Sequence, residues 1–342
     1  MKKSLLALAA LTAFAGVASA QSSVTLFGVV DVSVRQIDNT DKISTLSTDG
    51  NSSSRLGFRG IEDLGGGLKA GFWIEGSLSP DTGNASGQTW QRRSTISLIS
   101  NLGEIRLGRD YTPIFWNWTI FDPFGTNGVG NSANLGLEGG NSQGSGGAYG
   151  TLVRANNTVG YFLPANLGGF YGQAMVAAGE GTLGNKHYGG RLGYSAGPFN
   201  VAAAYGQTQV TPSEDGTSWN VGGSWDFGFA KLSGYYGEVD LLNTTQTNYY
   251  VGVTAPVGAL TLKASYGSVE NIFITQNNNA SADQIALGAV YDLSKRTALY
   301  GTVSRISNDG SAFRVAGSVA SGPKLNVGDN STGYEIGVRH SF

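Results

Sequence analysis

Val24-Thr25-Leu26-Phe27-Gly28-Val29-Val30-Asp31-Val32-Ser33-Val34-Arg35 is the stretch whose pattern decides the fold. Its apolar face reads Val24, Leu26, Gly28, Val30, Val32 and Val34, and the opposite face carries Thr25, Asp31, Ser33 and Arg35. Successive side chains of a β-strand point to opposite sides, so the alternation predicts a strand with one apolar and one wet face. The same pattern recurs along residues 260–267 and 334–342.

Sixteen segments of this kind follow the first twenty residues, and no sustained helical period interrupts them. Their approximate bounds are 23–35, 53–61, 67–78, 89–100, 103–111, 153–163, 169–179, 186–196, 199–208, 217–227, 229–238, 247–255, 259–269, 282–292, 297–306 and 332–342. The connections alternate between short and long, and the long ones include 36–52, 112–152, 270–281 and 307–331. All eight prolines fall in connections, because proline has no N–H to donate to a sheet.

The alternating loop lengths predict an all-β protein, a 16-stranded antiparallel transmembrane β-barrel. Membrane-spanning strands have about 9–11 residues, with short turns on the periplasmic side and long loops outside. Closure of the barrel removes sheet edges, which lipid cannot hydrogen-bond. Aromatic residues on the apolar face, such as Tyr161, Tyr205 and Tyr334, fit girdles at the two lipid interfaces. The alternative is a soluble β-protein with these aromatics in its core.

Composition narrows the classes of function. The 342 residues include 53 Gly, no Cys and two His, and only 13% are charged. Without Cys there is no disulfide scaffold, thiol catalysis or Cys-ligated metal site, and two His disfavour a His-rich metal centre. A net charge of −2 gives no support to a nucleic-acid surface. The sequence has no Walker A lysine motif and no G-x-S-x-G, so we expect no enzyme, no cofactor and no metal site.

The first twenty residues have the pattern of a signal peptide. Lys2 and Lys3 form a positive start, an apolar run spans 5–17, and Ala18-Ser19-Ala20 provides small residues for cleavage. We therefore expect 1–20 to be removed and the barrel to comprise residues 21–342, located in the outer membrane of a Gram-negative cell. The alternative is an N-terminal helix that remains in the fold.

Basic residues gather on the predicted lumenal face. Arg59, Arg93 and Arg154 take the inward register on the second, fourth and sixth segments, so we predict that they form the basic side of a pore constriction. Other charges expected in the lumen are Arg55, Lys69, Glu75, Arg106 and Lys263. The alternative is a set of scattered, solvated charges. Arg92 and Arg109 take the outward register, which places them at a membrane rim or under a neighbouring subunit.

The connection 112–152 is longer than the others and contains Trp116, Trp118, Phe121, Phe124 and Leu135. A segment so apolar is expected to fold into the barrel and narrow the pore, although an external flap is the alternative. The acidic groups predicted to face the arginines are Asp110 at its base and Asp122 and Glu138 within it.

Several motifs resemble the general porins of β-proteobacteria such as Burkholderia, Comamonas-like genera and Neisseria. They are residues 22–28, the stretch Ser54 to Ala70 with its Glu62-Asp63-Leu64-Gly65 turn, 107–113, 154–161 and the terminal 337–342. The resemblance implies a trimeric, water-filled barrel whose loop three enters the pore and faces an arginine cluster. It also implies that Phe342 is the signal for the outer-membrane assembly machinery, in a membrane of lipid and lipopolysaccharide. Loop three here reads Asp122-Pro123-Phe124-Gly125 where enterobacterial relatives have Pro-Glu-Phe-Gly, so its acidic residues depart from the pattern of those relatives.

These observations together predict a general diffusion porin, a passive channel for small hydrophilic solutes and ions that prefers anions. Selectivity in such a pore depends on its width and on the fixed charge where the path is narrowest. The alternatives are a substrate-specific channel of the same architecture, an outer-membrane barrel enzyme, and a soluble secreted binding protein.

Overall fold

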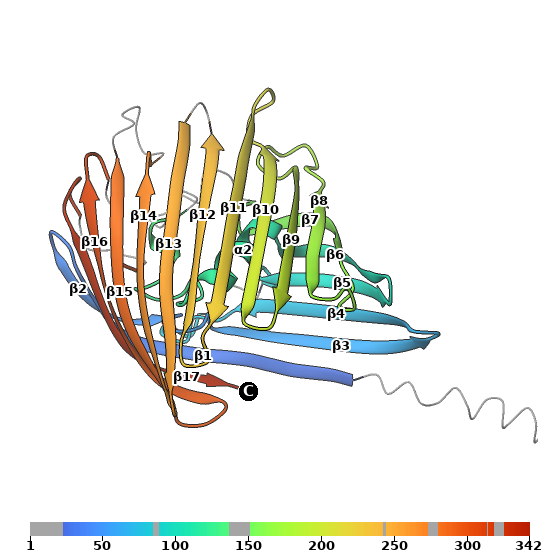
Figure 1. Ribbon diagram of the computed structural model, residues 1–342, viewed down its shortest axis with the longest axis horizontal. Helices are drawn as coiled ribbons and strands as arrows, with labels where there is room; N and C mark the ends of the chain where they lie inside the picture. The colour runs from blue at the N-terminus through green and yellow to red at the C-terminus, as the bar shows by residue number, and fades with distance from the viewer. Residues whose placement is uncertain are drawn as a thin grey trace, which may run out of the picture.

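The computed structural model describes residues 23–84, 89–136, 151–241, 244–272, 280–312, 314–317 and 325–342. These residues form a closed 16-stranded antiparallel β-barrel, as predicted (Figure 1). Strand β1 (Ser23–Asp38) closes the barrel because it pairs with β17 (Ser331–Ser341) on one side and with β3 (Arg55–Gly65) on the other. The proposed signal peptide lies outside the described residues.

The remaining barrel strands follow in chain order, each paired with its neighbours, and all sixteen predicted segments are confirmed. They are β4 (Leu68–Ser77), β5 (Arg93–Ser100), β6 (Gly103–Tyr111), β7 (Arg154–Phe162), β8 (Phe170–Ala177), β9 (His187–Ala196), β10 (Phe199–Gln209), β11 (Asp215–Asp226), β12 (Lys231–Leu241), β13 (Thr244–Val257), β14 (Leu260–Glu270), β15 (Ser281–Asp292) and β16 (Thr297–Asp309).

The second barrel strand is interrupted, which the sequence did not predict. Strand β2 (Lys42–Thr48) pairs with the second half of β1, residues 32–38, and β3 pairs with the first half, residues 23–29. Between them the chain leaves the sheet at residues 49–54, where the buried Asp31 carboxylate accepts the backbone N–H groups of Gly50, Asn51 and Ser52 at 2.8–3.1 Å. The connection predicted at 36–52 therefore contains a strand.

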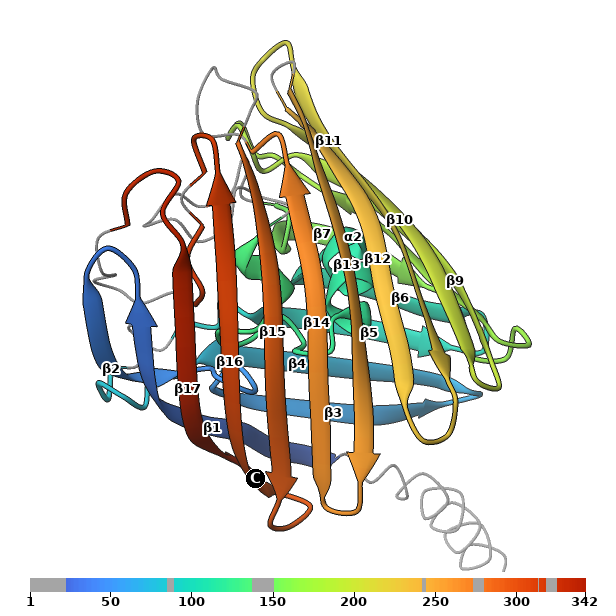
Figure 2. The ribbon, with the colours of Figure 1, turned by 60° about the vertical axis from the view of Figure 1, so that its left-hand side comes forward.

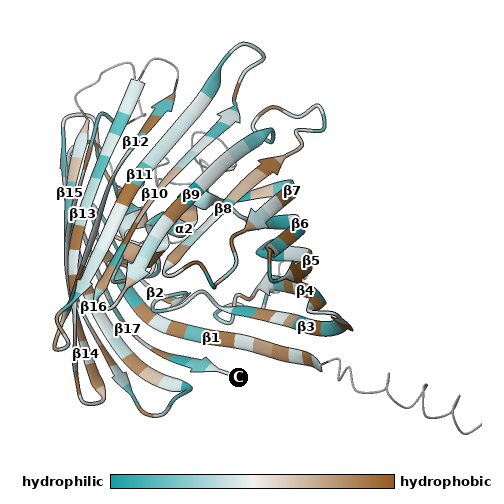
Figure 3. Ribbon diagram, turned by 45° about the vertical axis from the view of Figure 1, so that its right-hand side comes forward, coloured by the Kyte–Doolittle hydropathy of each residue, from teal (hydrophilic) through white to brown (hydrophobic). Residues whose placement is uncertain are grey.

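The two faces of the barrel differ as the alternation predicts. Along β17, Tyr334, Ile336 and Val338 on the outer face are 47–68% exposed. Polar side chains buried on the inner face include Ser33, Asn220 and Gln246. Figure 3 shows the resulting alternation of apolar and polar positions along strands such as β1 and β3. An apolar outside around a polar interior is the arrangement of a barrel in lipid.

Loop three, the connection between β6 and β7, folds into the barrel as predicted (Figure 2). It begins with helix α2 (Pro113–Phe121) and continues through a short 3₁₀ turn, η1 (Ser132–Asn134). Thr112 caps α2 by accepting the Phe115 N–H, and Pro113 occupies the first helical position, where its missing N–H costs nothing. Among the described residues, no helix is long and apolar enough to cross a membrane.

Glycines of the barrel wall make room for this loop. A Cβ on Gly222 of β11 would lie 2.2 Å from the Phe121 ring, and a Cβ on Gly252 of β13 would lie 2.5 Å from Pro123. Buried Ile114, Trp118 and Phe121 therefore pack directly against the wall. This packing fixes α2 on the side of β10 to β12 and leaves the lumen open on the opposite side, toward β3 to β7.

Candidate functional site

A cavity of about 850 Å³ separates loop three from the part of the wall that carries the arginines. We use "arginine wall" for six guanidinium groups that face the lumen from β3, β5, β6, β7 and the residue before β5, namely Arg55, Arg59, Arg92, Arg93, Arg106 and Arg154. The three predicted residues, Arg59, Arg93 and Arg154, all line this cavity.

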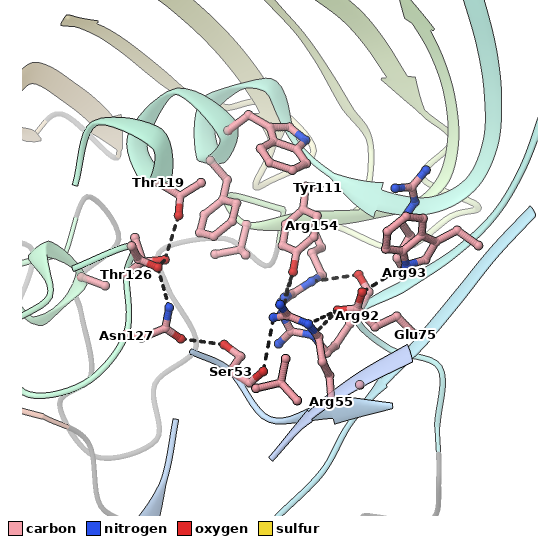
Figure 4. Close-up of a pocket in the computed structure, with 18 of the residues that line it drawn as sticks. Ser53, Arg55, Glu75, Arg92, Arg93, Tyr111, Thr119, Thr126, Asn127 and Arg154 are labelled. Carbon is pink, nitrogen blue, oxygen red and sulfur yellow. Dashed lines mark hydrogen bonds and ion pairs between the residues drawn. The ribbon is translucent and has the colours of Figure 1, made fainter. Parts of the chain in front are cut away.

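Three members of the arginine wall, Arg55, Arg92 and Arg154, gather around Tyr111 and Glu75. The Tyr111 hydroxyl accepts hydrogen bonds from Arg92 and Arg154, each at 2.8 Å, and the Arg154 guanidinium lies 4.3 Å from the Tyr111 ring centre. Glu75 Oε1 accepts from Arg92 Nε at 2.6 Å and lies 3.9 Å from Arg55 Nε. Figure 4 shows Arg55, Arg92 and Arg154 close together; Arg55 is the first residue of β3 and Arg154 the first of β7. Arg55 and Arg92 thus share one carboxylate, and Arg154 is held beside them by the Tyr111 hydroxyl.

Two other members of the wall, Arg59 and Arg93, pack against the ring of Trp73. The guanidinium of Arg93 lies 4.6 Å from its ring centre, and that of Arg59 lies 5.2 Å from it and 5.3 Å from Phe27. Aromatic faces attract a cation without cancelling its charge, so these contacts hold Arg59 and Arg93 in place as charged groups. Arg93 is also 3.7 Å from Asp110.

Arg106 is the most strongly paired member of the wall. Its guanidinium bonds Asp110 at 2.6 Å and Glu104 at 2.8 Å. Asp110 is fully buried, and Ser97 also donates to Glu104. Because these two carboxylates compensate Arg106, it adds less to the field in the lumen than Arg59 does.

The loop side of the cavity is neutral among the described residues. It presents Trp116, Thr119, Thr126 and Asn127, of which Figure 4 shows the last three facing the arginine wall. Asn127 accepts a hydrogen bond from Ser53, so the interrupted second strand meets loop three at this point.

The expectation that Asp122 faces the arginines is corrected. Its carboxylate is buried inside loop three, where it accepts hydrogen bonds from the backbone N–H groups of Phe124, Thr126 and Ser132, and from the hydroxyls of Ser132 and Tyr250. Asp110 belongs to the arginine wall itself, and Glu138 lies outside the described residues. Asp122 therefore holds the shape of the loop.

The register predicted for Arg92 needs correction, whereas the structure shows the outward register that was predicted for Arg109. Arg92, predicted to face outward, points into the lumen because β5 begins only at Arg93, so Arg92 is not part of the strand alternation. Arg109 takes the outward register, but it bonds the Gln91 carbonyl and the Asn156 side chain of its own chain.

Of the remaining predicted residues, Lys69 and Lys263 lie away from the arginine wall, whereas Phe342 lines the same cavity as the wall. Lys69 is exposed near the turn that joins β3 to β4, and Lys263 lies on β14, 5.5 Å from the Phe124 ring centre. The backbone of Phe342 exchanges two hydrogen bonds with Gly28, each 3.1 Å long.

Loop three is also fastened to β17, through a contact that the sequence did not predict. Glu335 accepts the Val129 N–H at 3.0 Å and pairs with Arg35 at 2.9 Å, in an almost completely buried site. The only signal for this contact was the inward register of Arg35. Removing either charge of a buried pair leaves the other unpaired, which is costly.

The net charge of the arginine wall is positive. Its six guanidiniums are accompanied by three carboxylates, those of Glu75, Glu104 and Asp110. Arg59 and Arg154 have no carboxylate partner among the described residues. The same part of the chain contains no group of three His, Cys, Asp or Glu residues that could hold a metal ion.

A closed barrel with an apolar exterior, a polar lumen and a loop folded inside it defines a transmembrane channel. A family model described as "Gram-negative porin" matches residues 7–311, and the chain belongs to that family. It is therefore a general diffusion channel of the Gram-negative outer membrane.

The similar proteins agree with this assignment. The chain is 40% identical to outer membrane porin protein 32 of Delftia acidovorans, over the full length of both chains. It is 29% identical to an outer membrane porin protein of Bordetella pertussis, again over both full lengths. The solved structure of an anion-selective porin from Comamonas acidovorans matches with a TM-score of 0.82 and 36% identity, covering 94% of this chain and 100% of that one.

Proposed function

We propose that this porin is anion-selective and that the arginine wall sets the preference. The observation that carries the proposal is the pair Arg59 and Arg154, two lumenal cations without a carboxylate partner, facing a loop surface that is neutral among the described residues. Fixed charge near the narrowest part of a pore raises the concentration of counter-ions there. The similar porin from Comamonas acidovorans is described as anion-selective, which supports the same interpretation.

Exchange of ions in single-channel recordings tests this proposal. Replacing chloride by a large organic anion should lower the conductance strongly, whereas replacing potassium by lithium should change it little. A conductance that follows the cation instead would refute the proposal.

Solute uptake by liposomes separates a general pore from a substrate-specific one. With the channel reconstituted, the rate of swelling should fall smoothly with the size of neutral sugars and rise linearly with their concentration. Saturation at millimolar sugar would favour the substrate-specific alternative. We also propose that the chain has no catalytic activity, since its sequence contains no recognisable catalytic motif.

The assembly state and the partners complete the proposal. We propose a homotrimer, embedded among lipid and lipopolysaccharide, that reaches the membrane through the outer-membrane assembly machinery after removal of residues 1–20. The family resemblance of the motifs and the terminal Phe342 support this. Native mass measurement in mild detergent should give three copies of a chain that begins at Gln21.

A further inference from the structure

A second cavity, of about 550 Å³, lies on a different part of the wall. It is lined from β14, β15 and β17, from the short turns that follow β13 and β15, and by Asn51. Figure 2 shows both turns at the same end of the barrel. The cavity shares no lining residue with the one beside the arginine wall. The two cavities are therefore separate regions of the barrel wall.

This second cavity is basic. Lys263 and Lys295 line it together with Arg339, and Asp292 supplies the only carboxylate among the described residues of the lining. Asp292 is 3.6 Å from Arg339 and its side chain is 50% exposed, so water screens that pair strongly. The two lysine ammonium groups are left without an ion-pair partner among the described residues.

Two of these cations are poised to accept a ligand. Lys263 lies 5.5 Å from the Phe124 ring centre of loop three, and the buried Asp122 carboxylate also attracts its ammonium without forming an ion pair with it. The Nε of Arg339 is buried and has no hydrogen-bond partner in the described part of the chain. Hydroxyl groups of Thr261 and Ser294 lie in the same lining. The site thus combines strong donors that lack an acceptor.

We propose that this cavity binds the phosphate group of small phosphorylated solutes. A phosphate monoester carries about −1.5 to −2 charges at neutral pH and three strong acceptor oxygens. Lysine ammonium groups bind phosphate as point charges, arginine adds directed N–H donors, and hydroxyls satisfy the remaining oxygens. The volume exceeds what a single phosphate group fills, so a phosphomonoester with a small organic part fits better than the free ion. The inference rests on the proposed function only because anions must enter the pore.

Block of the chloride current by glycerol phosphate tests the proposal. A solute that binds in the lumen should reduce the chloride conductance in a saturable way. In the variant Lys263→Gln with Lys295→Gln, the half-blocking concentration should rise about tenfold, which corresponds to about 1.4 kcal/mol. Lys295 is exposed on a turn, so the single variant Lys295→Gln keeps the barrel intact and should show a smaller rise in the same direction.

The matched control is Lys42→Gln, the same substitution at an exposed lysine of β2 outside the cavity. It should leave the half-blocking concentration unchanged. Inorganic phosphate should block more weakly than glycerol phosphate, and succinate, a dianion without tetrahedral oxygens, more weakly still. Equal block in parent and cavity variants, or equal block by succinate and glycerol phosphate, would overturn the proposal. A parent channel without anion preference would refute the proposed function and not the phosphate site. The phosphate site is tested by comparing block between the parent and the cavity variants, and that comparison does not depend on the anion preference.

Discussion

Removing the two unpaired arginines of the arginine wall should shift the selectivity of the pore toward cations. Arg59→Ala with Arg154→Ala lowers the charge of a wall that holds six guanidiniums and three carboxylates. Because neither residue has a carboxylate partner among the described residues, the double substitution leaves no carboxylate newly unpaired. The loop opposite presents no described acidic group to the cavity, so the loss is not offset from that side.

The size of the effect follows from Coulomb's law. An ion about 5 Å from a guanidinium in water interacts with it by about 0.8 kcal/mol. At about 0.1 M salt, screening reduces this energy to about 0.5 kcal/mol, a factor of about 2.3 in local ion concentration. Since anions are enriched and cations depleted by the same factor, losing two arginines changes the permeability ratio about 30-fold. At about 1 M salt, the same calculation gives a change of about threefold in the permeability ratio.

The assay is the ratio of anion to cation permeability in planar bilayers, measured for parent and variant at both salt concentrations. Arg305→Ala is the matched control, because Arg305 takes the outer register of β16, opposite the exposed Ile285. The control should leave the ratio unchanged. An unchanged ratio in the double variant, or an effect that does not shrink as salt rises, would refute the reasoning.

Three more changes test the structure around the pore. Asp122→Ala should loosen loop three and give larger, noisier single-channel currents, since each buried donor left unpaired costs about 1–3 kcal/mol; the Thr119→Ala control should stay quiet, and a quiet Asp122→Ala channel would contradict the role of Asp122. Glu335→Gln should lower the melting temperature in detergent, because breaking a buried ion pair costs about 3–5 kcal/mol; an unchanged melting curve would argue against the contact with Arg35. Deleting Phe342 should reduce the amount of barrel in the outer membrane more than any lumenal substitution does, and equal surface levels of the two forms would count against an assembly signal.

The strands and much of the arginine wall could be predicted because both depend on a local rule. A strand has a side-chain period of two, so the inward direction of Arg59, Arg93 and Arg154 follows from the apolar residues beside them. The rule predicted the wrong direction for Arg92 because this residue lies just before β5 and outside the strand. Periodicity carries no information about residues outside an element.

The parts that the sequence did not reveal depend on tertiary contacts. Helix α2 contains Ile114, Phe115, Trp116 and Trp118 and is apolar on nearly all sides, so it shows no amphipathic period. The direction of Asp122 is set by Ser132 and Tyr250, the second of which is 128 residues away. The break after β2 likewise depends on the distant carboxylate of Asp31.

The zero-current potential of the unmodified channel across a tenfold gradient of potassium chloride, with about 0.1 M on the concentrated side, tests the central claim most directly. If the arginine wall sets the selectivity, the sign of the potential will be that of a membrane permeable mainly to chloride. A potential of the opposite sign would show that cations pass more readily and would contradict the account.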